Sequence, residues 1–153
     1  MNKSSIVTSL IIASLVLTGC EENSDTSTPI ANITENGVTS INTANLATTI
    51  ENMALGELSQ LEIDGLTYMR EEEKLAQDVY AALYTQWGQK IFNNISNSEI
   101  THTEAILQLL NRYNLNDPLA GKEAGTYQNE TLQNLYTTLI AEGSATLIDA
   151  LQV

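Results

Sequence analysis

Apolar residues recur with a helical period from about residue 60 onward. The first run is spaced by three and four residues in alternation and consists of Leu66, Met69, Glu73, Ala76, Tyr80, Leu83 and Trp87. This spacing is typical of one face of an amphipathic helix. Ser59 and Glu62 fit a capping box at its start, and Gly88 follows its end. The pattern therefore predicts a helix over residues 60–86.

A second run with the same spacing follows Gly88. It consists of Phe92, Ile95, Glu99, His102, Ile106, Leu109 and Tyr113. Asn114 is a plausible left-handed stop, and Asp117-Pro118 breaks any continuation. We predict a second helix over residues 89–113.

Two shorter helices are expected after a loop over residues 115–126. The first spans about 129–141 and ends at Gly143, and the second spans Leu147–Leu151 with Ser144 as its cap. No segment has a convincing strand pattern. The expected fold class is therefore all-α, with a long antiparallel helix pair at its centre.

The N-terminus has the features of an export signal. Lys3 precedes an apolar run, Ile6–Leu17, which is shorter than the roughly 20 residues that span a bilayer. The ending Leu17-Thr18-Gly19-Cys20 resembles a bacterial lipobox, which implies cleavage before Cys20 and lipid attachment to it. We expect a lipoprotein signal over residues 1–19 and a protein anchored in the cell envelope. A plain signal peptide that happens to end in cysteine is the alternative.

The segment after Cys20 is rich in Ser, Thr, Asn, Asp and Glu, and its sparse apolar residues show no lasting period. We expect a flexible tether over residues 20–54 and a folded domain over residues 55–153. An irregular but packed N-terminal arm is the alternative. The net charge of −13 argues against binding to nucleic acid or electrostatic attraction to anionic lipid. A covalent lipid anchor needs neither.

Three polar residues interrupt the apolar stripes, namely Glu73 on the first predicted helix and Glu99 and His102 on the second. Unpaired carboxylates are costly to bury, and two that face each other are worse. A bound cation resolves the conflict, because it supplies positive charge and accepts oxygen and nitrogen ligands. The spacing of Glu-x-x-His places both side chains on one helix face, where they can reach the same ion.

Other interpretations of these residues stay open. Glu-x-x-His is a weak signal, and the only histidine of the chain could be hydrogen-bonded in the core. Glu71 and Glu72 continue the acidic run, and we expect them on a solvated face with Arg70 and Lys74 nearby. The position of all three candidate ligands on otherwise apolar stripes favours the metal site.

Several segments resemble the ferritin-like proteins grouped as domain of unknown function 2202. The resemblance covers about Leu55 to Val153, and its most specific segment is MREEEKLA. The matching segments are LTYMREEEKLAQDVY at 66–80, ALYTQWG at 82–88, IFNNI at 91–95, SExxH at 98–102, LNRY at 110–113, LQNLY at 132–136 and Gly143-Ser144.

The resemblance implies a ferritin-like four-helix bundle with a di-iron-type site. In that group a tyrosine near the metals follows the first-helix glutamate by seven residues, as Tyr80 follows Glu73. The resemblance therefore implies that Glu73 is a ligand, Glu99 a bridging carboxylate, His102 a terminal ligand and Tyr80 a neighbour of the metals. Iron is expected, and manganese or zinc would also accept these ligands.

The chain departs from the family pattern because Val153 lies where a third long helix should begin, and no second histidine is present. One chain then offers half a di-metal site. Either the reading frame is truncated, or two chains pair in a homodimer that binds metal and reacts with dioxygen or peroxide. A non-catalytic helical module of the envelope that binds a partner protein is the alternative function.

Overall fold

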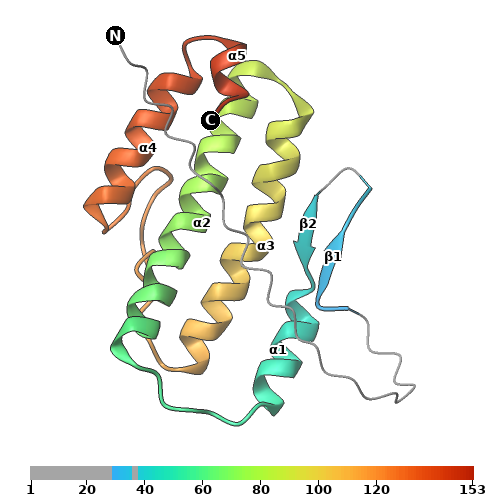
Figure 1. The fold of residues 1–153 in the computed structure, drawn as a ribbon, viewed down its shortest axis with the longest axis vertical. Coiled ribbons are helices and arrows are strands. Elements are labelled where there is room, and N and C mark those ends of the chain that lie inside the picture. Colours follow the sequence, from blue (N-terminus) through green and yellow to red (C-terminus); the bar gives the residue numbers. More distant parts are fainter. Residues whose placement is uncertain (1–28, 36–37) are drawn as a thin grey trace.

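The computed structural model describes residues 29–35 and 38–153. Its centre is a pair of long antiparallel helices, α2 (Gln60–Trp87) and α3 (Lys90–Arg112), which lie side by side in Figure 1. Helix α4 (Glu130–Gly143) packs against α2, and the short α5 (Leu147–Ala150) packs against α4. The prediction of a predominantly helical fold with a long helix pair is confirmed.

The ends of α2 follow the chemistry of their residues. The Ser59 backbone N–H donates to Glu62 Oε2 at 2.8 Å, and the Glu62 N–H donates in return to Ser59 Oγ at 3.4 Å, which completes the capping box. Gly88 ends α2 in the left-handed conformation with φ of 66°. Asn114 adopts the same region after α3, with φ of 52°. The last helix differs, because Thr146 caps α5 while Ser144 caps the end of α4.

The hydrophobic core lies between α2, the start of α3, the residues 115–129 and α4. Its buried members are Leu75, Val79, Leu83, Phe92, Leu119, Tyr127, Leu132 and Ala150. Gly143 brings the end of α4 close to α2, since a Cβ there would lie 2.7 Å from Leu83 Cδ2. The Trp87 indole N–H donates to the Gly143 carbonyl at 2.9 Å. These contacts fix α4 along one side of the helix pair.

The N-terminal part of the described chain differs from the expected tether. Strands β1 (Ala31–Ile33) and β2 (Thr39–Ile41) form an antiparallel hairpin, with Asn32 opposite Ser40. Helix α1 (Thr43–Asn52) follows, and β2 and α1 pack against α3 (Figure 1). We call residues 29–35 and 38–54 the arm. The prediction that no segment forms a strand is wrong, because strands of this length are too short to show a period.

The lipobox and the signal segment lie outside the described residues. Within residues 29–35 and 38–153, none of the helices combines the length and hydrophobicity needed to cross a bilayer.

Candidate metal centre

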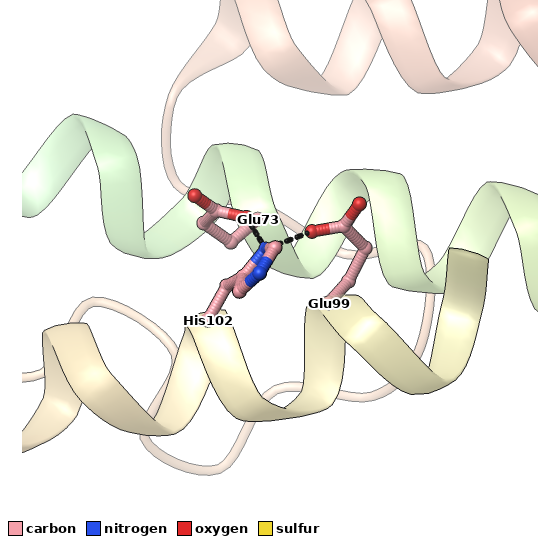
Figure 2. A group of neighbouring side chains, drawn as sticks. All are labelled: Glu73, Glu99 and His102. Atoms are coloured by element: carbon pink, nitrogen blue, oxygen red, sulfur yellow. Dashed lines mark hydrogen bonds and ion pairs between the residues drawn. The ribbon is translucent and has the colours of Figure 1, made fainter. Parts of the chain in front are cut away.

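The structure brings together the three polar side chains that interrupt the apolar stripes. Glu73 points from α2 toward α3, where Glu99 and His102 are one turn apart (Figure 2). One ligand atom from each residue lies within 4.8 Å of the other two. His102 Nδ1 is 2.8 Å from Glu99 Oε2 and 3.3 Å from Glu73 Oε2. Each side chain is partly buried, with 12% to 22% of its surface exposed.

A hydrogen bond between α2 and α3, one turn from this cluster, sets the register of the two helices. The Arg70 guanidinium extends from α2 and donates through Nη1 to the Thr103 carbonyl of α3 at 2.8 Å. Its Nε and Nη2 donate to the two carboxylate oxygens of Asp117, both at 3.1 Å. Because Arg70 precedes Glu73 by three residues and Thr103 follows His102, this bond aligns the turn that carries Glu73 with the turn that carries His102.

The electrostatics of the cluster are those of two carboxylates that share one imidazole. Hydrogen bonds to Glu73 and Glu99 outweigh burial and raise the pKa of His102 to about 10. At neutral pH the imidazolium therefore donates to the carboxylates through Nδ1. Burial raises the pKa of Glu73, and the neighbouring Glu99 adds to the increase while the bond from His102 opposes it. Among the described residues, His102 is the only ion-pair partner of either carboxylate.

Tyr80 lies on the same side of α2 as Glu73, two turns further along. Its ring stacks on Phe92 with centroids 6.3 Å apart and an interplanar angle of 20°. Burial, followed by the negative charge of Glu99, raises the pKa of the Tyr80 phenol. The phenol therefore stays protonated at neutral pH, near but not hydrogen-bonded to the cluster.

The prediction of a solvated face for the charges next to Glu73 is wrong. Glu71 is only 2% exposed, and its carboxylate accepts the backbone N–H groups of Gln128 and Asn129 at the start of α4. Arg70 is 7% exposed. Glu72 is partly buried, and its pKa is raised by burial and then by the charge of Glu73.

Lys74 is also engaged, because it pairs with Asp78, which is 7% exposed. The Asp78 carboxylate accepts the Tyr127 hydroxyl and the Gly125 N–H, both at 2.8 Å. The burial of Asp78 cannot be predicted from local periodicity, because the residues that cover this face of α2 are 115–129, far along the chain.

The donor set fits a divalent cation. Two carboxylate oxygens and one imidazole nitrogen converge from rigid helices, and these donor types suit iron, manganese and zinc. A cation can replace the proton of His102 that now joins the imidazole to both carboxylates, because metal ligation requires the neutral ring. Glu73, Glu99 and His102 are the residues that would hold it.

Comparison with known proteins places these residues inside a recognised domain. The family described as "Uncharacterized protein domain (DUF2202)" matches residues 62–153. The chain is 45% identical over 96 residues to the uncharacterized protein MJ0754 of Methanocaldococcus jannaschii. The aligned residues make up 63% of this chain and 52% of the relative. The crystal structure of hypothetical protein MJ0754 from Methanococcus jannaschii matches with a TM-score of 0.64 and 42% identity, over 65% of this chain and 57% of the other. The chain thus spans about half the length of this relative.

Proposed function

This chain belongs to the DUF2202 family, and from that premise we propose that it binds a divalent metal ion through Glu73, Glu99 and His102. The observation that carries the proposal is the convergence of two carboxylates and one imidazole within 4.8 Å, from two helices held in register. A protein that used these residues only for stability would more simply bury apolar side chains there.

We propose further that α2 and α3 form one helix pair of a ferritin-like bundle. A glutamate on one helix that faces Glu-x-x-His on its neighbour is the ligand arrangement of half a di-metal bundle site. Iron is the cation that we favour, and when bound it would supply redox chemistry with dioxygen or peroxide. The residues of the chain would hold the ion, release the His102 proton and keep the Tyr80 phenol protonated beside the site.

A second copy of the chain is the partner that we propose for completing the site. A di-metal bundle site uses about six protein ligands, and the residues that the structure describes offer three in one cluster. A two-fold axis would duplicate Glu73, Glu99 and His102 and bring the two sets face to face. Met69 supports this arrangement, because it lies one turn before Glu73 and is 44% exposed.

We propose a lipid anchor at Cys20 as the link to the cell envelope. The proposal depends on the sequence Leu17-Thr18-Gly19-Cys20. Replacement of Cys20 by Ala should move the protein from the membrane fraction to the soluble fraction. Unchanged membrane association of the Cys20→Ala protein would refute the anchor.

Titration of the metal-free protein with Fe(II) under anaerobic conditions, and with Mn(II) and Zn(II), tests the metal site. The variants Glu73→Gln and Glu99→Gln should each lower affinity at least about 100-fold, since even an outer-shell change costs roughly 10- to 100-fold. Glu104→Gln is the matched control, because this exposed glutamate of α3 also loses its charge but lies outside the cluster. Equal affinity in all variants, or no binding to the wild type, would refute the metal site and favour the partner-binding module.

A further inference from the structure

The arm is held to α3 through its backbone. Three side chains on one stripe of α3 make the bonds, and they are spaced seven and four residues apart. Thr101 Oγ1 accepts the Ile41 N–H at 3.1 Å, and Gln108 Nε2 donates to the Thr43 carbonyl at 3.0 Å. Arg112 Nη2 donates to the carbonyl of Met53 at 3.0 Å.

One of these bonds falls in the turn that carries the proposed ligands. Thr101 lies between Glu99 and His102 in the sequence. Its hydroxyl accepts from β2 and in turn donates to the Ser98 carbonyl at 2.9 Å, so that the arm is linked to the residue immediately before Glu99. Ser98 is itself 6% exposed.

His102 thus has an anchored neighbour on each side. Thr103 is fixed to α2 through its carbonyl and Arg70, and Thr101 is fixed to the arm through its hydroxyl. The two bonds leave α3 in different directions, one toward α2 and one toward the arm. Together they limit rotation and sliding of the turn that presents His102 and Glu99.

The arm is the weaker of these two anchors. Among its described residues only Ile50 is buried, and residues 55–57, which lead from the arm toward α2, are all exposed. Elements with few buried apolar contacts open locally at low free energy. The arm also lies outside the family match, which begins at residue 62. The buried core cluster contains no residue of the arm, so we expect the arm to open locally while the helix pair stays folded.

We propose that the arm is a positioning element for the metal centre, and that Thr101 is the positioning residue through which it acts. This inference rests on the proposed metal site. Docking of β2 holds the α3 turn in the geometry in which Glu99 and His102 meet Glu73, so that the docked arm raises metal affinity. By linkage, the metal must favour arm docking by the same factor.

Two variants of the full chain test this coupling, with Zn(II) as the probe. Thr101→Val removes the hydroxyl that joins β2 to α3. Gln108→Leu removes the bond to Thr43 and leaves the ligand turn unaltered, which keeps the test decisive if Thr101→Val disturbs the helix. Thr138→Val is the matched control, because its hydroxyl also donates to a helix carbonyl, that of Asn134.

We expect Zn(II) affinity to fall roughly 2- to 10-fold in Thr101→Val and Gln108→Leu, the range of one net hydrogen bond, and to stay unchanged in Thr138→Val. In the wild type, saturating Zn(II) should slow hydrogen exchange of the Ile41 amide by a similar factor. The Gln133 amide of α4, bonded to the Asn129 carbonyl, should not respond.

The possible failures are distinct. Zn(II) binding to the wild type with unchanged exchange at Ile41, and full affinity in both variants, would overturn the coupling while the metal site stands. A wild-type chain that binds no Zn(II) would overturn the metal site and the coupling together.

Discussion

Replacement of Arg70 by Met gives the most informative test of how the helix pair is held in register. Arg70 is 7% exposed and donates three hydrogen bonds, two to Asp117 and one to the Thr103 carbonyl. Methionine occupies a similar apolar volume and donates none of them. The change therefore removes the hydrogen bond between α2 and α3 without opening a large cavity.

The expected loss of stability in Arg70→Met depends on how well the hydrogen-bond partners of Arg70 can be hydrated after the change. A hydrogen bond that involves a charged group contributes roughly 1.5–3 kcal/mol, but burial of the guanidinium opposes this gain. The Asp117 side chain is 21% exposed and can be hydrated once Arg70 is gone, which limits the loss. We expect the free energy of unfolding to fall by about 2–3 kcal/mol, less than the roughly 3–5 kcal/mol of a fully buried broken pair.

Urea denaturation measures this loss, and Zn(II) titration measures its effect on the site. Lys90→Met is the matched control, because it removes one positive charge at an exposed position of α3. We expect Arg70→Met to lower Zn(II) affinity as well, since the turns that carry Glu73 and His102 lose their alignment. A loss of stability below about 0.5 kcal/mol, the range of ordinary surface changes, or unchanged Zn(II) affinity in the folded variant, would refute the reasoning.

Three further predictions concern packing, protons and assembly. Gly143→Ala should lower the free energy of unfolding by about 1–3 kcal/mol, because the added Cβ would lie 2.7 Å from Leu83 Cδ2. Gly65→Ala is the control within α2, because a Cβ added there would have no atom within 4 Å. In the same urea experiment it should raise the free energy of unfolding by about 0.5–1 kcal/mol. Zn(II) affinity should rise about tenfold per pH unit between pH 6 and 8, because the pKa of His102 is about 10 and each bound ion displaces the proton of the imidazolium. Calorimetry in buffers of different ionisation enthalpy would show this proton release. A Zn(II) affinity that does not change with pH would contradict the prediction. Sedimentation should show that Mn(II) shifts monomer toward dimer by mass action, and a metal-bound monomer would contradict the two-fold site.

The helices and the cluster were accessible from the sequence because both depend on local periodicity. A helix that places an apolar residue every third or fourth position also fixes the direction of Glu73, Glu99 and His102. The Ser59–Glu62 capping box and the stops at Gly88 and Asn114 are likewise local, and each is present in the structure.

The buried charges next to Glu73 were not accessible in this way. Glu71 and Arg70 are covered by residues 115–129, which return over α2 from the far end of α3. The composition of the acidic run MREEEK is typical of an exposed surface. Its burial depends on tertiary contacts that the composition does not show. A packed arm was only the alternative to a tether, and its strands and helix were not predicted, because the strands are three residues long and the helix has one buried residue, Ile50.

The central claim is that Glu73, Glu99 and His102 bind one divalent cation in each chain. Crystals grown with Mn(II), with diffraction recorded at the manganese absorption edge, test it most directly. We predict an anomalous peak between the three side chains, at coordinating distance from at least one donor atom of each. A cluster that keeps its bond from His102 to Glu99 without any peak between the side chains would contradict the claim.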